Sequence, residues 1–252
     1  GAELLRKTGQ KSDLLCRKTE DRVLENLRIG NSPIENRTFL HTAPHHDDIV
    51  LGYHPYFTNL VRRSSTHHYF AYMTSGFTAV TNRYMESAVE DLLDRLIRGH
   101  FDELLKAEYF DPANTIARRM DTSYFLQGAA HHRAEQEQDA VARRLLRNMI
   151  ELYEDDSVTN IQQRLKELLN YFQTQYPGKK DIPLVQMLKG RMREFESDLK
   201  WAYYGFTGEC VRHLRLGFYK GDIFTEIPQI ERDIPPILRL LHEVTPDIVT
   251  VA

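Results

Sequence analysis

Two short apolar runs on either side of a helix-like stretch are the feature that most constrains this fold. The first run covers residues 37–43, and its bulky side chains are typical of a strand buried on both faces. The second run covers residues 68–74, and residues 49–63 between the two have helical character limited by Pro55. Strands joined by a connection of helical length pair in parallel. The sequence therefore predicts a βαβ unit in an α/β fold.

The rest of the chain divides into a helical part and a return to the α/β pattern. Between residues 83 and 184, apolar residues recur at helical spacing in three sets, near 85–97, 141–150 and 161–172. Alternating helix and strand patterns then follow near 186–203, 211–216, 229–244 and 247–251. We expect a Rossmann-like, mostly parallel sheet with flanking helices, in an α/β domain formed by residues 35–82 and 185–252. A large helical insertion, residues 83–184, interrupts this domain.

Two segments outside the predicted sheet allow more than one role. Residues 83–184 form either a lid or partner-binding subdomain, or an insertion that packs on the domain and shapes the rim of its site. Residues 1–34 are polar with a weak helical pattern that Gly30 and Pro33 interrupt, so they are a linker or an N-terminal helical segment. In the last predicted helix, Pro235 and Pro236 are expected in the first turn.

Composition excludes several classes of protein. The 252 residues are 41% hydrophobic and 27% charged, which predicts a globular chain. A formal net charge of −3 lacks the basic footprint of a nucleic-acid-binding protein. The sequence has no signal-peptide pattern and no apolar run near the ~20 residues that span a membrane. Its two cysteines, Cys16 and Cys210, form no CxxC pair. We therefore predict a cytoplasmic protein without a membrane span or bound nucleic acid.

The segment Thr42-Ala-Pro-His-His-Asp-Asp48 places four polar side chains directly after the first predicted strand. In open α/β sheets, binding and catalytic residues lie at the carboxyl ends of the strands. Zinc accepts imidazole nitrogen and carboxylate oxygen, and its catalytic sites commonly combine three protein ligands with a water molecule. His45 and Asp48, three residues apart on a strand-to-helix turn, can converge on one ion. Asp47 then lies beside the ion, where a carboxylate can act as general base.

Other interpretations of the same residues stay open on spacing alone. Asp47 or Asp48 can be a plain helix cap, and His45 or His46 can be a hydrogen-bonded turn residue. Clustered His and Asp residues also hold metals in other hydrolases such as phosphoesterases, often as a pair of ions. A non-catalytic regulatory or interaction domain is a further alternative, which the large helical insertion favours.

The same segment resembles the signature of the PIG-L/LmbE-like deacetylase family, approximately Ala/Pro-His-Pro-Asp-Asp-Glu at the end of the first strand. His45 matches the first zinc-binding histidine, Asp48 the zinc-binding aspartate and Asp47 the general base. His46 replaces the proline of that signature, and Ile49 replaces its glutamate. Three looser likenesses follow. Met73–Gly76 resembles the turn after the family's second strand. Arg193 with Glu196 resembles its Arg-x-x-Glu helix, and Pro246–Val249 resembles its Pro-Asp-Val/Ile-Val strand.

The resemblance implies a zinc-dependent hydrolase that removes the acetyl group from an N-acetylated amino sugar or a related amide. Arg193 and Arg83 are candidate contacts for a phosphate or for sugar hydroxyls of such a small-molecule substrate. The third zinc ligand of the family is a histidine beyond the Pro-Asp-Val/Ile-Val strand, and this chain ends at Ala252 in a core-strand pattern. We therefore expect a C-terminally truncated domain that binds zinc weakly and hydrolyses little.

The variant Pro-His-His-Asp-Asp-Ile also resembles chains in which an LmbE-like part follows a glucosamine-6-phosphate deaminase-like domain. This likeness implies a fused N-terminal deaminase-like domain in the parent protein, with the polar N-terminal segment as its linker. The remaining histidines are candidates by residue type alone, and neither His213 nor His242 matches the family's third ligand. Further candidates of this kind are His54, His67, His68, His131 and His132.

Overall fold

A four-stranded, all-parallel β-sheet lies at the centre of the structure, a computed structural model that describes residues 3, 6, 7, 9, 12–62, 65–176, 178–218 and 227–252. The strand order is β3-β2-β1-β4. Leu40 of β1 pairs with Tyr69 of β2 on one side and with Val249 of β4 on the other. The predicted α/β fold with a parallel sheet is thus confirmed. The strands are β1 (Thr38–Ala43), β2 (His67–Tyr72), β3 (Val211–His213) and β4 (Ile248–Val251).

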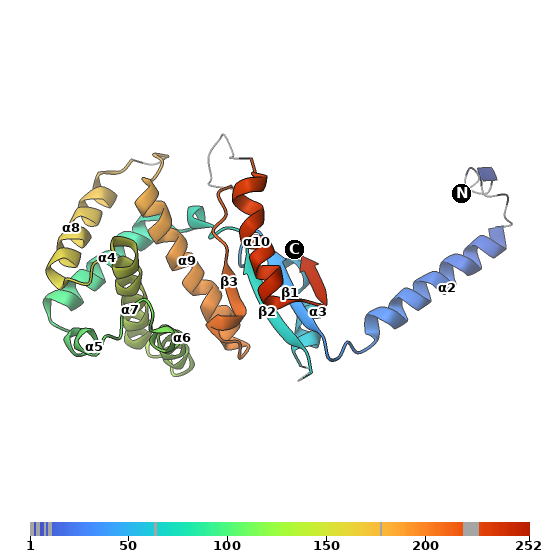
Figure 1. The fold of residues 1–252 in the computed structure, drawn as a ribbon, viewed down its shortest axis with the longest axis horizontal. Coiled ribbons are helices and arrows are strands. Elements are labelled where there is room, and N and C mark those ends of the chain that lie inside the picture. The colour runs from blue at the N-terminus through green and yellow to red at the C-terminus, as the bar shows by residue number, and fades with distance from the viewer. Residues whose placement is uncertain are drawn as a thin grey trace.

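Helices cover both faces of the sheet, as Figure 1 shows. They are α3 (Asp48–Val61), α9 (Pro183–Tyr203) and α10 (Ile230–Val244). On one face, Phe70 of β2 stacks on Trp201 of α9 with ring centroids 3.6 Å apart. On the other face, Leu40 and Ala71 pack against Leu240 of α10. Successive strand residues therefore alternate between two apolar layers, which explains the continuously bulky strand sequences.

The predicted helical insertion forms a block on one side of the sheet (Figure 1). It has a core of its own, and α9 supplies Val185, Leu188 and Met192 to that core. The 3₁₀ helix η1 (Phe77–Ala79) leads from the sheet into the block, and η2 (Gly208–Cys210) precedes β3. The helices of the block are α4 (Asn82–Ile97), α5 (Asp102–Lys106), α6 (Thr115–Ala130), α7 (Ala134–Tyr153) and α8 (Val158–Thr174).

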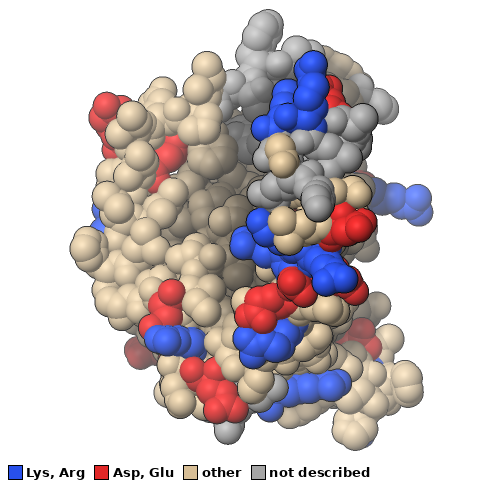
Figure 2. Space-filling view, turned by 90° about the vertical axis from the view of Figure 1, so that its right-hand side faces the viewer, with Lys and Arg blue, Asp and Glu red and all other residues tan. Residues whose placement is uncertain are grey.

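Residues 12–31 of the N-terminal segment form a helix. Helix α2 (Ser12–Asn31) contains no buried residue and extends away from the rest of the molecule (Figure 1). Seen from the side on which α2 projects, basic and acidic side chains are interspersed around a recessed area of uncharged surface (Figure 2). Of the helices that the structure describes, none is long and apolar enough to cross a membrane.

Helix α2 does end at Asn31, inside the predicted break at residues 30–33. Two other local expectations are corrected. Pro235 and Pro236 lie in the second turn of α10, because the helix begins at Ile230 and its first turn is capped by the carboxylate of Asp233. The third strand ends at His213, and Arg215 beyond it adopts a left-handed backbone conformation with φ of 51°.

Helix α6 carries no apolar period in the sequence, and the structure shows why. Its buried positions include Ala117, Asp121, Thr122 and Gly128, which are small or polar. A helix that packs through such residues is invisible to a search for apolar spacing.

Helix α3 is limited as Pro55 predicts: its backbone leaves the helical region at Tyr53 (φ −149°, ψ 30°), and this kink divides it into two short helical pieces.

Candidate functional site

The segment after β1 lies at the point where the strand order of the sheet reverses. From β1 the chain builds outward through β2 to β3, and then returns to place β4 on the opposite side of β1. In open α/β sheets, ligands bind in the crevice outside the carboxyl ends of the strands at such a topological switch point. The residues that follow β1 therefore occupy the position where this fold places its binding sites.

His45, Asp47 and Asp48, called here the His-Asp-Asp cluster, converge in this segment. One ligand atom from each residue lies within 4.8 Å of the other two. The Nδ1 atom of His45 is 3.8 Å from Oδ2 of Asp48. All three residues are partly exposed, so the cluster is open to solvent on one side. The structure thus brings together the three residues that the sequence predicted as two ligands and a base.

The alternative that Asp47 or Asp48 is a plain helix cap has a different outcome for each of the two residues. Asp47 occupies the N-cap position of α3, but its side chain forms no capping hydrogen bond. Its carboxylate instead lies 3.6 Å from a guanidinium nitrogen of Arg193. Asp48 does have a local structural role, because its Oδ2 atom accepts a hydrogen bond of 2.9 Å from the backbone N–H of His45. That bond ties the two predicted ligands to each other.

Gly76 holds the imidazole of His45 in place from the turn after β2. A Cβ atom built on Gly76 would lie 2.9 Å from Cδ2 of His45, which is closer than real Cβ contacts. The backbone of Gly76 is also left-handed, with φ of 64°. Glycine is therefore required here both for its conformation and for the close approach of the histidine ring. The predicted turn at residues 73–76 thus contributes directly to the cluster.

Helix α9 presents a charged face to the cluster. Arg193, Glu196 and Lys200 follow one another at helical spacing, and Arg193 forms an ion pair with Glu196. The ammonium of Lys200 donates a hydrogen bond to the backbone carbonyl of His46. Burial lowers the pKa of Lys200 to about 8, although Asp47 and Asp48 nearby oppose this shift. Sequence reasoning found Arg193 and missed Lys200, which the same spacing would have placed on this face.

His46, which stands where the resembled signature has proline, points into the protein. Its side chain is 12% exposed and lies 3.7 Å from a carboxylate oxygen of Glu196. The ring meets Tyr72 edge-on, with centroids 6.4 Å apart. Burial lowers the pKa of His46 to about 4, and the neighbouring Arg193 and Lys200 add to the effect. A neutral imidazole therefore packs beneath the cluster, where it supports the turn without occupying the open side.

The other predicted residues lie apart from the cluster. Arg83 is exposed in the first turn of α4. The His213 ring lies 3.4 Å from a carboxylate oxygen of Asp198, and His54 bonds the hydroxyl of Tyr204. Asp247, from the looser strand likeness, lies at the amino ends of the strands, where it accepts a hydrogen bond of 2.8 Å from the backbone of Thr38. Exposed positions hold His67, His131, His132 and His242.

The donor set of the cluster fits zinc. Ligand bonds of about 2.0–2.2 Å in a tetrahedral arrangement place neighbouring ligand atoms roughly 3.3 Å apart. The Nδ1 atom of His45 and the Oδ2 atom of Asp48 are 3.8 Å apart, and a small side-chain rotation would bring them to this distance. The imidazole of His45 and the carboxylate of Asp48 are donors that zinc accepts, and the carboxylate of Asp47 lies beside them. Arg193 and Lys200 lie close enough to balance the two negative charges of the cluster.

No family model, no curated protein and no solved structure matches this chain. The likeness to the PIG-L/LmbE-like family therefore stays a prediction carried by the short segments quoted above. What the protein does has to be argued from the geometry of the His-Asp-Asp cluster and its place in the sheet.

Proposed function

We propose that this protein is a zinc-dependent amide hydrolase that removes the acetyl group from an N-acetylated amino sugar or a related small amide. The observation that carries the proposal is the convergence of His45, Asp47 and Asp48 at the topological switch point of a parallel sheet. The likeness of the same residues to a deacetylase signature supplies the reaction class and the substrate class.

In this proposal His45 and Asp48 hold the metal, and Asp47 acts as general base. Bound zinc supplies a Lewis acid and lowers the pKa of water to about 7. Asp47 takes the proton from the attacking water, which a carboxylate beside the metal can do. Arg193, 3.6 Å from Asp47, orients that carboxylate. Lys200 offers a second positive charge on the same side of the site.

Zinc binding tests the ligand roles first. Metal-free protein titrated with zinc by calorimetry should show weak but saturable binding of one ion per chain. His45→Ala and Asp48→Ala should abolish that binding, whereas Asp47→Asn should retain most of it because its role is in proton transfer. His131→Ala, at an exposed histidine of the helical block, is the matched control. Unchanged zinc binding in both ligand variants would overturn the metal site.

Acetate release from a panel of N-acetylated amino sugars tests the base. With zinc present, Asp47→Asn should lower turnover by about 10²- to 10⁴-fold, the contribution typical of a general base. Two ions about 3.5–4 Å apart would favour the phosphoesterase alternative instead. The turnover of this chain is expected to be low, so the panel is also run on protein that includes any residues that natively follow Ala252. One bound zinc in that protein without hydrolysis of any substrate would contradict the deacetylase proposal and favour an interaction domain.

A further inference from the structure

A cavity, called here the arginine cavity, lies between the helical block and the sheet, on the face of α9 that points away from the His-Asp-Asp cluster. Its volume is about 490 Å³, and it is bounded by α6, α7, α9 and the segment around β3. On α9 its lining comes from Glu194, Asp198 and Ala202, whereas Arg193, Glu196 and Lys200 face the His-Asp-Asp cluster. None of its described lining residues belongs to that cluster, so this cavity is separate from the proposed zinc site.

Arginine dominates the polar lining of this cavity. Five arginines contribute to the wall, and hydroxyl side chains such as Thr122 lie between them. Each arginine also has a carboxylate partner within ion-pair distance. Arginine guanidinium groups match phosphate oxygens in a bidentate geometry, which makes this residue the preferred one for phosphate recognition. The arginines are Arg118, Arg119, Arg144, Arg212 and Arg215.

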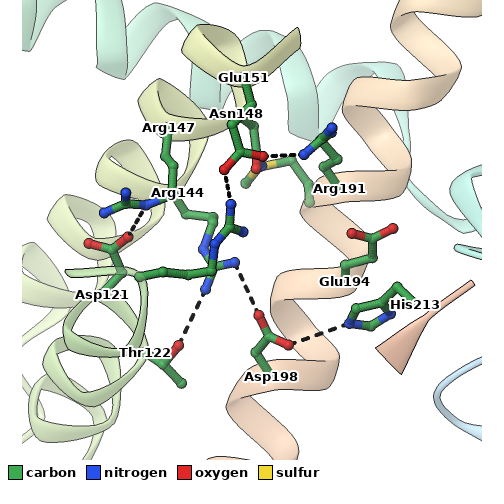
Figure 3. Close-up of polar contacts among 12 residues, drawn as sticks. Asp121, Thr122, Arg144, Arg147, Asn148, Glu151, Arg191, Glu194, Asp198 and His213 are labelled. Carbon is green, nitrogen blue, oxygen red and sulfur yellow. Dashed lines mark hydrogen bonds and ion pairs between the residues drawn. The ribbon is translucent and has the colours of Figure 1, made fainter. Parts of the chain in front are cut away.

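Arg144 of α7 is the most buried of the five, at 1% exposure. Its Nη1 atom donates to Asp198 at 3.0 Å and its Nη2 atom to Thr122 at 3.3 Å, as Figure 3 shows. Its Nε atom is buried and has no hydrogen-bond partner among the described residues. Arg144 therefore brings a buried and only partly hydrogen-bonded guanidinium to the wall of the cavity.

The carboxylates around Arg144 are shared between several cations. Glu151 pairs with both Arg118 and Arg191, and Asp198 accepts from both Arg144 and His213 (Figure 3). Burial, together with the nearby Arg144 and Arg147, lowers the pKa of Arg118 to about 10. Around Glu151 and Asp198, three arginines therefore face two carboxylates, which leaves one positive charge without a carboxylate of its own and favours an anion there.

We propose that this cavity binds a phosphate-bearing small molecule, with the arginines of its wall as the recognition groups. The volume falls within the range of small-molecule sites. Free inorganic phosphate and the phosphate group of a larger molecule offer the same chemistry, and the space beyond one phosphate favours the larger molecule. This proposal does not depend on zinc chemistry at the His-Asp-Asp cluster.

Calorimetry and thermal-shift measurements on the full chain test the site with four probes. These are inorganic phosphate, pyrophosphate, ribose 5-phosphate and ribose, each against sodium chloride at matched ionic strength. Saturable binding of the phosphate compounds, without binding of ribose, supports the proposal. Tighter binding of ribose 5-phosphate than of inorganic phosphate identifies an organic phosphate as the ligand class. Equal thermal shifts with chloride, or no saturable binding of any phosphate compound, overturn it.

Variants at the exposed rim of the cavity separate a loss of phosphate binding from a loss of folding. Arg119→Gln and Arg212→Gln each remove a charge whose ion-pair partner, Glu209 or Glu243, is more than half exposed. Phosphate affinity should fall by about tenfold in each. Arg164→Gln, at an exposed arginine that pairs with Glu167 elsewhere, should bind phosphate like the wild type. Wild-type affinity in both rim variants would contradict the proposal, and unaltered melting temperatures verify that each variant is folded.

Discussion

At the residue scale, Gly76 decides how closely the turn after β2 approaches His45. Gly76→Ala would place a methyl group 2.9 Å from the His45 ring at a left-handed backbone position. We expect zinc affinity to fall by about tenfold, in line with the loss of groups that orient a ligand. Gly178→Ala is the control, because Gly178 also has positive φ but nothing within 4 Å of an added Cβ. Equal zinc affinity in both variants would show that Gly76 does not position His45.

Two buried histidines of adjacent strands predict a sensitivity to acid. His41 and His68 bond each other at 3.0 Å, and burial lowers the pKa of His41 to about 3 and that of His68 to about 4. Between these values and the ordinary pKa of about 6.5, the unfolded chain binds protons that the folded chain does not. The free energy of unfolding should therefore decrease on acidification below that value, by up to about 1.4 kcal/mol per pH unit for each histidine.

Urea denaturation at pH 7 and pH 5 measures this effect. Replacing one member of the pair, as in His68→Gln, should reduce the difference in unfolding free energy between the two pH values. The exposed His131 provides the comparison, because His131→Ala should leave the difference unchanged. A difference of the same size in His68→Gln and in the wild type would assign the acid sensitivity to other groups.

At the scale of elements, helices α6 and α7 are joined by a buried ion pair. Arg147 of α7 donates to Asp121 of α6 at 3.0 Å, and both side chains have 0% exposure. Tyr109 donates a further bond of 2.7 Å to Asp121, and the guanidinium lies against the rings of Tyr109 and Phe110. This pair explains how α6 can pack closely without an apolar stripe.

Breaking that pair from one side should be more damaging than removing it whole. Asp121→Asn leaves Arg147 buried and uncompensated, so we expect a loss of about 3–5 kcal/mol in unfolding free energy. The double variant Asp121→Leu with Arg147→Met should lose less, because no buried charge remains. Chemical denaturation of both proteins gives the comparison. A double variant less stable than Asp121→Asn would contradict this account of the pair.

At the scale of the whole molecule, α9 joins the helical block to the sheet. Its first half supplies Val185, Leu188 and Met192 to the core of the block, and its second half places Trp201 in the core beside β2. Asp198 of the same helix bonds Arg144 of the block and His213 of β3 (Figure 3). One helix therefore belongs to both cores, and neither core can lose α9 without exposing apolar surface.

This arrangement predicts a single cooperative unfolding transition. Trp201 is the one tryptophan of the chain and reports on the sheet, whereas most of the helical content lies in the block. Fluorescence and circular dichroism should therefore follow the same denaturant curve, the behaviour of a two-state protein. An earlier loss of circular dichroism, with Trp201 fluorescence still native, would show that the block unfolds separately.

The sequence alone determined the local elements wherever burial is apolar. Bulky runs marked β1 and β2, helical spacing marked α4, α7 and α8, and the cluster of His45, Asp47 and Asp48 stood out because four polar residues follow a buried strand. The predicted order of elements was sufficient for a parallel α/β fold, since strands separated by helices pair in parallel. These features depend on neighbours along the chain, which is why they are visible in one dimension.

Only the tertiary structure decided what depends on residues distant in sequence. The position of β4 beside β1 puts the cluster at the switch point of the sheet, and the turn at Gly76 and the face of α9 complete its surroundings. The arginine cavity has the same origin, because α6, α7, α9 and β3 each contribute part of its wall. Polar contacts of this kind follow no periodic pattern, since their partners are chosen by packing in three dimensions.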